Sequence, residues 1–185
     1  PNGMFEFSGR NVVLTTGGYA ANPELWAKLT PRVPLCSHVN PYARGDGLVA
    51  AGKLGATIEG SDKFLCTFAG VLDNPRDRRS GAFLPLSPNF RKIWEIFVNA
   101  DGRRFMKEDH ASIDYRERSL LKQHGMAMHI VFDHAMLHNA SSLTLDPPEV
   151  YRAKFGRHHA FVKAGTIAGL AKKLGVPAAN LVAIW

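Results

Sequence analysis

The densest mixture of titratable side chains in this sequence lies in the segment from His110 to Arg116. An imidazole at His110 can shuttle protons near neutral pH, although it could equally cap the next helix. Arg116 is a weak acid in water because its pKa exceeds about 12, but beside a carboxylate in a closed site it can orient an anion and relay protons. Together with the hydroxyl of Tyr115, these groups are the candidate catalytic residues.

A purely structural interpretation of the same segment is also open. The charged residues from Asp114 to Arg118 have the spacing of a solvated helix face, on which acids and bases pair weakly. We favour that interpretation for Glu117 and Arg118. For Tyr115 and Arg116 the catalytic and the structural interpretations are balanced.

Two of the remaining histidines have a spacing that could bind a metal ion. His134 and His138 lie four positions apart beside Asp133, a spacing that can place two imidazoles on one helix face as metal ligands. No Glu follows the first of them and no third ligand stands at a known spacing, so we predict no metal site. His158 and His159 are adjacent, and in a regular element their side chains would point apart at the surface.

Two glycine turns are candidates for holding a cofactor. Gly17-Gly18 ends a short apolar run, and Gly45-Asp46-Gly47 begins an amphipathic helix that Asp46 is placed to cap. Backbone N–H groups at a helix N-terminus suit a phosphate or another polar cofactor edge. The second turn satisfies a permissive dinucleotide pattern, G-x-G-x-x-G/A. No buried strand precedes it, so as a lone motif it indicates only the start of a helix.

The elements that must position these residues follow from apolar periodicity and turn formers. Residues 11–16 form a run with little polar alternation, which predicts a strand buried on both faces of a parallel sheet. Further strands are predicted at 64–69, 93–98 and 128–132. Helices are predicted after Asn22, from Asp46 to about Gly55, from Asp114 to Gln123 with Ser112 or Asp114 as cap, and from Thr166 to Leu174. The chain is therefore expected to be α+β, a mixed α/β arrangement.

A hairpin is the strongest local signal in the sequence. Asn99-Ala100-Asp101-Gly102 has the composition of a tight turn and leads into Arg103-Arg104-Phe105. We predict a structural hairpin in which Arg104 is tied to a neighbouring acid or carbonyl group.

Composition excludes several classes of protein. The 185 residues are 45% hydrophobic and 21% charged, which is typical of a globular chain and not of a disordered or fibrous one. No stretch approaches the ~20 apolar residues of a membrane-spanning helix, and no signal peptide is visible. Cys36 and Cys66 belong to no C-x-x-C pair, so we interpret them as buried thiols in a reducing cytosol. A cytoplasmic location is expected.

The chain is basic, with 23 Lys+Arg against 16 Asp+Glu and a net charge of +7. Its positive residues are spread along the sequence, and the densest run, residues 76–79, is interrupted by an acid. This distribution favours a solvated loop or a lining for anionic small molecules over a nucleic-acid track. The alternative function is a non-catalytic basic binding module, with nucleic acid as its candidate partner. Because the chain lacks an initiator Met and begins near an apolar run, it is expected to be a piece of a longer protein.

Four features in the same order resemble the fumarate reductase/succinate dehydrogenase flavoprotein superfamily, which includes 3-ketosteroid dehydrogenases, tricarballylate dehydrogenases and urocanate reductases. The third is the most specific, because it resembles the family's N-x-x-G-x-R-F-x-x-E hairpin. The four features are the Gly17-Gly18 turn with Asn22, the segment from Arg44-Gly45-Asp46-Gly47 to Gly55-Ala56, the segment from Asn99 to Glu108, and the late helix from Thr166 to Leu174 followed by Asn180-Leu181.

The resemblance implies an FAD-dependent oxidoreductase. Residues 1–60 would be the end of an FAD-binding α/β domain, and residues 61–185 a capping domain that closes over a small substrate. The cofactor-binding residues would be Gly17, Gly18, Gly45, Asp46 and Gly47. The implied reaction moves a hydride to or from the flavin N5 across a C–C bond activated by a carbonyl or carboxylate, while a side chain of the cap handles the proton.

The departures from the family pattern narrow this expectation. Arg44 stands where the family usually has Thr, and the stretch 64–69 lacks the His-Pro-Thr of fumarate reductases. Their Thr-Arg-Asp has its nearest counterpart in Arg116, at a shifted spacing, and Tyr115 resembles the tyrosine of ketosteroid dehydrogenases. A strict fumarate reductase is thus disfavoured. The chain also lacks the glycine-rich element that grips the FAD pyrophosphate, so alone it is expected to bind FAD weakly, to be inactive and to self-associate through its open strand edge.

Overall fold

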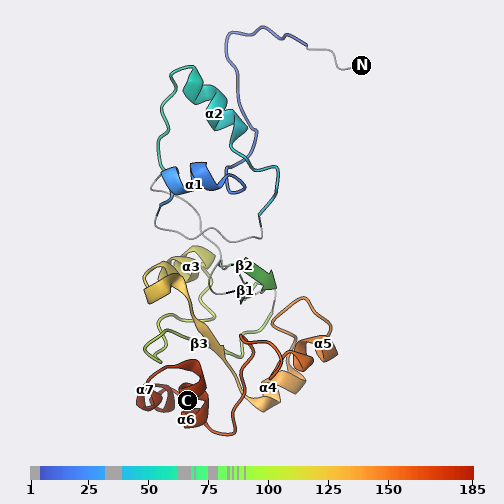
Figure 1. The fold of residues 1–185 in the computed structure, drawn as a ribbon, viewed down its shortest axis with the longest axis vertical. Helices are drawn as coiled ribbons and strands as arrows, with labels where there is room; N and C mark the ends of the chain where they lie inside the picture. Colours follow the sequence, from blue (N-terminus) through green and yellow to red (C-terminus); the bar gives the residue numbers. More distant parts are fainter. Residues whose placement is uncertain are drawn as a thin grey trace. The chain divides into compact units, whose positions relative to one another are not determined.

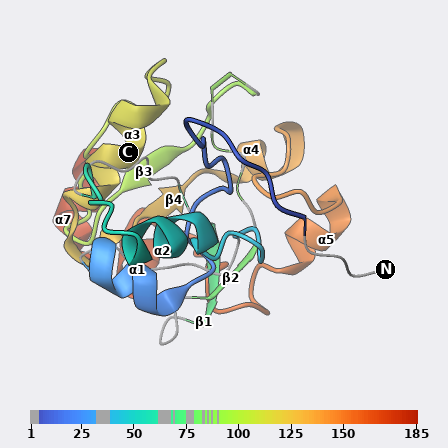
Figure 2. The same cartoon turned by 90° about the horizontal axis from the view of Figure 1, so that it is seen from above.

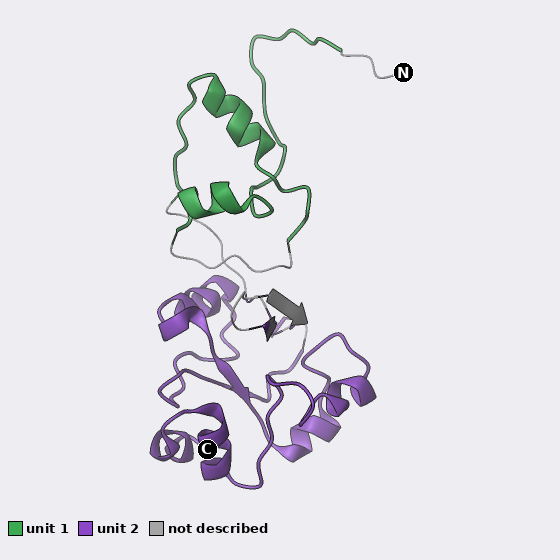
Figure 3. Ribbon diagram, in the orientation of Figure 1, with its two compact units in different colours: residues 1–35, 39–64 green, residues 36–38, 65–185 purple. Residues whose placement is uncertain are grey.

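The computed structural model describes residues 5–31, 39–61, 68, 70–74, 79–82, 84, 86, 88–89 and 91–185 (Figure 1). The chain divides into two compact units (Figure 3). Unit 1 comprises residues 1–35 and 39–64, and unit 2 comprises residues 36–38 and 65–185. The assignment of residues 1–60 to a cofactor domain and 61–185 to a capping domain concerns function, and it stays a prediction. Cys36, Cys66 and most of the strand expected at 64–69 lie outside the described residues.

Unit 1 contains two short helices that lie next to each other in both views (Figures 1 and 2). Helix α1 covers Pro23–Leu29, and the side chain of Asn22 accepts a hydrogen bond from the backbone N–H of Leu25 at 3.0 Å. This start was predicted, since Asn is a preferred N-cap and Pro fits the first helical position. Helix α2 covers Asp46–Lys53. The predicted cap was wrong here, because Gly45 is the N-cap in a left-handed conformation and Asp46 is already the first helical residue.

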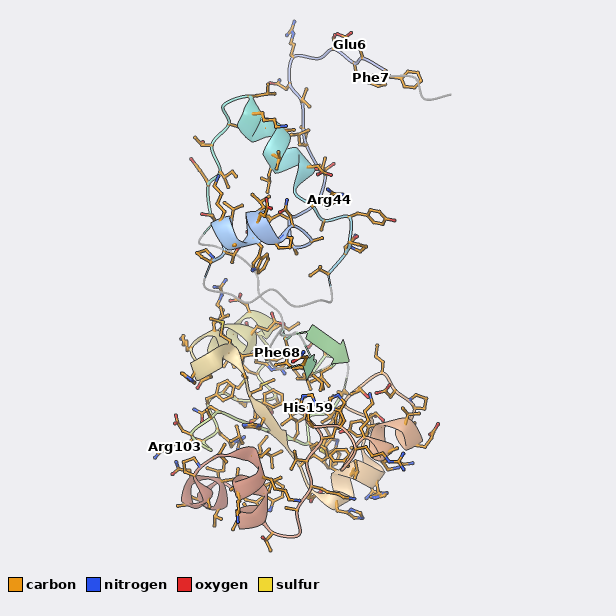
Figure 4. The ribbon with its side chains drawn as sticks, in the orientation of Figure 1. Glu6, Phe7, Arg44, Phe68, Arg103 and His159 are labelled. Atoms are coloured by element: carbon orange, nitrogen blue, oxygen red, sulfur yellow. The ribbon has the colours of Figure 1, made fainter. Side chains whose placement is uncertain are left out.

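The segment before α1 corrects a second expectation. Residues 11–16 are extended but form no strand, and the side chains of Val12 and Val13 are 76% and 84% exposed. Phe7 lies on the same extended segment (Figure 4). A strand buried on both faces requires neighbouring strands, and all the strands found among the described residues belong to unit 2. The apolar run therefore remains uncovered.

Unit 2 is built around two antiparallel strand pairs. β1 (Val71–Asn74) pairs with β2 (Arg79–Ala82), and β3 (Ile96–Val98) pairs with β4 (His129–Val131). Side chains alternate across a strand, so neighbouring residues of β3 enter different cores. Phe97 packs in a large cluster with Leu86, Met136 and others, whereas Val98 packs in a second cluster under the C-terminal helices. The β3–β4 pair is thus the wall between two cores.

Helices complete unit 2. Figure 1 shows α4 beside α5 and α6 beside α7. The helix predicted from Thr166 to Leu174 is α6, with Thr166 as its N-cap and the left-handed Gly175 as its C-cap. Helix α7, a single short helix behind Pro177 whose Leu181 is fully buried, was not predicted. The helices are α3 (Ile113–Leu121), η1 (His124–Met126), α4 (His134–Asn139), α5 (Pro148–Ala153), α6 (Ile167–Leu174) and α7 (Ala178–Ala183). Within the described residues, none of the helices has the length and apolar character required to cross a bilayer.

The predicted hairpin is confirmed. The N–H of Asn99 donates to the carbonyl of Arg103 at 3.0 Å, and Val98 bridges Arg104 in antiparallel fashion. Gly102 has a φ of 71°, a conformation that glycine adopts without strain. The side chain of Asn180 donates to the carbonyl of Asp101 at 2.8 Å, which fixes the turn against α7.

Arg104 is tied to an acid, as predicted. Its Nε and Nη2 donate to the two carboxylate oxygens of Glu108 at 2.9 and 2.5 Å. The same Glu108 is buried and accepts the backbone N–H of Phe97 at 2.9 Å. The hydrogen bonds to Glu108 raise the pKa of the Arg104 guanidinium. Glu108 therefore joins the hairpin to the central strand.

His129 in β4 gives unit 2 a pH-dependent stability. Burial lowers the pKa of His129 below its ordinary value near 6.5, because the charged imidazolium is poorly solvated there. The unfolded chain therefore takes up this proton first, and the free energy of unfolding should fall as the pH drops below about 6.5. Well above pH 6.5 neither the folded nor the unfolded chain binds this proton, so His129 adds no pH dependence to the free energy of unfolding.

Urea unfolding at pH 7.5 and 5.5 measures this effect. We expect His129→Gln to lose less stability than the parent chain between the two values. His124→Gln, at an exposed position, should behave like the parent chain. An equal loss in the His129→Gln variant and the parent chain would contradict the assignment.

Candidate functional site

The two glycine turns of unit 1 lie side by side. The N–H of Gly45 donates to the carbonyl of Gly18 at 3.0 Å, and the N–H of Ala21 donates to the carbonyl of Ala43 at 2.8 Å. The side-chain amide of Asn22 donates to the carbonyl of Arg44 at 3.1 Å. These hydrogen bonds join residues 18–22 to residues 43–45, which are distant in sequence, and the joined turns form one edge of unit 1.

The space around these glycines differs between the two turns. A Cβ on Gly45 would lie 2.5 Å from Cδ2 of Leu25, and a Cβ on Gly47 would lie 2.1 Å from Oγ1 of Thr16. Among the described residues, by contrast, nothing lies within 4 Å of a Cβ placed on Gly17 or Gly18. The turn at Gly45-Asp46-Gly47 is thus close-packed, and the turn at Gly17-Gly18 is not.

A cavity of about 520 Å³ lies beside this edge. Its size is in the range of small-molecule sites. Arg44, the loop residue before α2 (Figure 4), contributes a cationic side chain, and Glu24 contributes an anionic one. The lining residues are Ala21, Asn22, Pro23, Glu24, Pro41 and Arg44.

The close packing around Gly45 gives a testable expectation. Gly45→Ala combines a φ of +78° with a clash against Leu25, so it should destabilise the α1–α2 region by about 2 kcal/mol or more. Gly52→Ala, inside α2 with open space around it, should stabilise the helix by roughly 0.5–1 kcal/mol. Hydrogen exchange of the Val49 amide, which donates to the Gly45 carbonyl, reports both effects. Similar protection in both variants would refute the packing argument.

In unit 2 the structure brings His110 and Tyr115 together. Their ring centroids are 4.2 Å apart at the start of α3. The side chain of Ser112 caps the helix, as one of the two predicted caps, by accepting the N–H of Tyr115 at 3.2 Å. Nδ1 of His110 accepts the N–H of Ser112 at 3.0 Å. In the neutral imidazole the proton is therefore on Nε2. Tyr115 is 45% exposed and His110 is half-buried.

Arg116 points the other way. Its side chain is only 1% exposed, donates to the carbonyl of Leu86, and lies near the rings of Phe68 and Phe97, with its guanidinium carbon 5.7 and 5.8 Å from the ring centroids. Phe68 is labelled in Figure 4. Burial lowers the pKa of Arg116, and Glu95 and Glu117 oppose that shift. The catalytic role of Arg116 stays a prediction, and its observed contacts are those of a core residue.

The acids and bases of α3 divide between surface and interior. Arg118 pairs with Asp114 through its Nε at 2.8 Å on the exposed side, as the solvated-face interpretation predicted. For Glu117 that interpretation was wrong, because its side chain is only 7% exposed. The surroundings of α3, and not its own sequence spacing, determine which carboxylate is buried.

The carboxylate of Glu95 is buried, and the sequence pattern did not predict this. It forms an ion pair with Arg91 and accepts the N–H of Trp94 at 3.0 Å. Burial, together with the negative charge of Glu95, raises the pKa of Tyr151. The four-residue spacing of Arg91 and Glu95 could have indicated their ion pair, since oppositely charged side chains at this spacing often pair.

The histidine pairs behave differently from each other. His134 and His138 occupy one side of α4 with ring centroids 4.3 Å apart. His158 and His159 were expected to point apart but stack at 4.6 Å, because they lie in a turn and not in a regular element. In the part of the chain that the structure describes, no group of three or more His, Cys, Asp or Glu side chains is placed to hold a metal.

Unit 1 therefore joins its two glycine turns by hydrogen bonds, and unit 2 is a mixed α and β structure in which the rings of His110 and Tyr115 lie together at the start of α3. The family described as "FAD binding domain" matches residues 1–183, and this chain belongs to that family. The match confirms FAD as the cofactor.

Relatives support the same assignment. The chain is 28% identical over 180 residues to a probable fumarate reductase of Shewanella frigidimarina (strain NCIMB 400), covering 97% of this chain and 28% of the relative. It is 27% identical over 195 residues to 3-oxosteroid 1-dehydrogenase of Mycobacterium tuberculosis, covering 94% and 31%. The resemblance to fumarate reductases and ketosteroid dehydrogenases is thereby confirmed.

A solved structure supports the fold. The open conformation of a flavocytochrome c3 fumarate reductase matches 91% of this chain and 27% of that chain, with a TM-score of 0.58 and 26% identity. The chain thus spans less than one third of the length of each of these relatives. The expected mixed α and β fold is confirmed.

Proposed function

We propose that this chain is part of an FAD-dependent oxidoreductase that acts on a C–C bond next to a carbonyl or carboxylate. The observation that carries the proposal is the pair of glycine turns, joined from Gly18 to Gly45 and open at Gly17-Gly18, in a member of the FAD-binding family. The names of the two relatives point to a common chemistry. Fumarate offers a C–C bond beside a carboxylate, and a 3-oxosteroid offers one beside a ketone.

The chain's own groups would have separate roles in binding the cofactor and in transferring the proton. Bound FAD supplies hydride chemistry. The turns at Gly17-Gly18 and Gly45-Asp46-Gly47 would present backbone groups to the cofactor. The Nε2 proton of His110 and the hydroxyl of Tyr115 would deliver or remove the substrate proton, since both belong to the exposed pair at the start of α3. The substrate would be a small anionic or carbonyl-bearing molecule and not a nucleic acid.

The complete protein provides the test of the acid–base pair. Tyr115→Phe removes only the hydroxyl and leaves the ring in contact with His110. We expect it to lower kcat by roughly 100-fold, the usual range for a proton-transfer group, with bound flavin unchanged. His124→Gln, an exposed substitution elsewhere in unit 2, should leave kcat as it is. Full turnover in both Tyr115→Phe and His110→Gln would remove the pair from the mechanism.

Residues 1–185 alone should neither hold FAD tightly nor turn over substrate. The sequence contains no strand followed by G-x-G-x-x-G, the element in which a helix N-terminus meets the pyrophosphate. Losing a few charge-assisted hydrogen bonds of roughly 1.5–3 kcal/mol each weakens affinity by several orders of magnitude. Titration of the purified chain with FAD, followed by flavin fluorescence, measures this. A yellow preparation with stoichiometric flavin would overturn the expectation.

A further inference from the structure

Two histidines of α4 form a pair that the proposed function does not use. His134 and His138 lie on consecutive turns of the helix, both exposed, with ring centroids 4.3 Å apart and ring planes 53° apart. Within the described residues, no hydrogen bond or ion pair engages either imidazole. Their nitrogen lone pairs are therefore available to a ligand.

The backbone that carries the pair is held in place. The side chain of Asp133 caps α4 by accepting the N–H of Met136 at 2.8 Å, and the N–H of Ala140 donates to the carbonyl of Met136 at 3.0 Å. Met136 itself is buried in the large core of unit 2. The helix thus presents two short side chains from fixed positions, so little conformational entropy is lost when both bind one ion.

The two rings are close enough to share a metal ion after a rotation of their side chains. A metal–nitrogen bond to histidine is about 2.0–2.1 Å long, which places the ring centre roughly 3.2 Å from the ion. Two imidazoles around one ion then have centroids about 5.2 Å apart at the tetrahedral angle and about 4.5 Å apart at a right angle. The observed 4.3 Å is slightly shorter than both values, so the rings must separate by up to about 1 Å to bind one ion.

Although the sequence pattern led us to predict no metal site, we propose that His134 and His138 form a two-imidazole chelate for a divalent transition metal ion. Imidazole suits Zn²⁺, Cu²⁺ and Ni²⁺, whereas Ca²⁺ and Mg²⁺ require oxygen ligands. The pair supplies two ligands, and water or a group from another molecule takes the remaining positions. Its two ligands are not among the residues proposed above to hold the flavin or to transfer the proton.

The second histidine pair provides an internal comparison. The rings of His158 and His159 stack nearly parallel, at 25°, which keeps their nitrogens from converging on one ion. Nδ1 of His158 is also occupied, since it accepts the N–H of Ala160 at 3.2 Å. Two adjacent histidines in a turn should therefore bind metal far more weakly than two histidines one helical turn apart.

Calorimetric titration of the 185-residue chain with Zn²⁺ tests the proposal. We expect one site in the parent chain and roughly 100-fold weaker binding in His134→Gln or His138→Gln, because a single imidazole lacks the effective concentration of a pair. The combined change His138→Gln with Asn139→His keeps the number of histidines but moves the second ring off the shared face, and it should weaken binding equally. All three positions changed in these variants are exposed, and circular dichroism verifies that α4 and the fold persist.

The histidine pair in the turn is the matched control. His158→Gln with His159→Gln should bind Zn²⁺ like the parent chain. Three results would overturn the proposal: no site in the parent chain, unchanged affinity in the single variants of α4, or loss of the site in the control. Zinc held elsewhere, for instance by a cysteine, gives the second of these results.

Discussion

Replacing Arg116 with alanine is expected to lower the free energy of unfolding by about 3–5 kcal/mol, the cost of removing one partner from a buried charged group. The change removes the hydrogen bond to the Leu86 carbonyl and the guanidinium near Phe68 and Phe97. It also removes a buried positive charge that interacts with the negative charges of Glu95 and Glu117. Urea unfolding of the chain measures the loss.

The neighbouring Arg118 is the matched control. It is on the same helix and forms an exposed pair with Asp114, so Arg118→Ala should cost no more than about 0.5 kcal/mol. A comparable loss in both variants would show that burial of Arg116 is not the cause. A stable Arg116→Ala variant of the complete enzyme that lost turnover would instead support the catalytic interpretation of this arginine.

Glu108→Ala should have the second large effect, about 3 kcal/mol or more. The buried carboxylate accepts the N–H of Phe97 and binds the guanidinium of Arg104, so its removal leaves a buried backbone donor without an acceptor. Thermal or urea unfolding reports the loss. Glu108→Gln keeps an acceptor for Phe97 and should lose less.

Asp109, the next residue, is the control that distinguishes loss of a buried carboxylate from loss of a negative charge at the surface. Asp109 is exposed and pairs loosely with Lys107, at 3.6 Å, so Asp109→Asn should change stability by less than about 0.5 kcal/mol. If Glu108→Ala were as mild as Asp109→Asn, the tie between the hairpin and β3 would contribute nothing to stability.

Local chemistry explains which parts of the fold were predictable. The turn at Asn99–Gly102 and the caps at Asn22 and Ser112 depend on residues within four positions. The turn and the helix start at Asn22 were predicted, and Ser112 was one of the two predicted caps of α3. The apolar run 11–16 depends on partner strands, and among the described residues unit 1 has none. The run therefore remained unpaired despite its strand-like composition.

In the candidate site too, features set by nearby residues could be predicted, and those set by tertiary packing could not. The proximity of Gly18 and Gly45 could be anticipated only from the resemblance, because no spacing rule joins turns so distant in sequence. The burial of Glu95 and Glu117 follows from tertiary packing, since their sequence neighbours look like those of solvent-exposed acids. The pairing of His110 with Tyr115 is a consequence of the Ser112 cap, which turns the chain at the start of α3.

The alternation along the first turn of α3 has an evolutionary consequence. Tyr115 faces solvent while Arg116, the next residue, anchors the helix in the interior. Substitutions on the outer side can therefore change the groups presented to solvent without weakening the anchor, whereas those on the inner side are constrained by packing. Position 115 can thus vary in the course of evolution while the framework secured by position 116 is kept, so the surface chemistry of this helix can change independently of the fold.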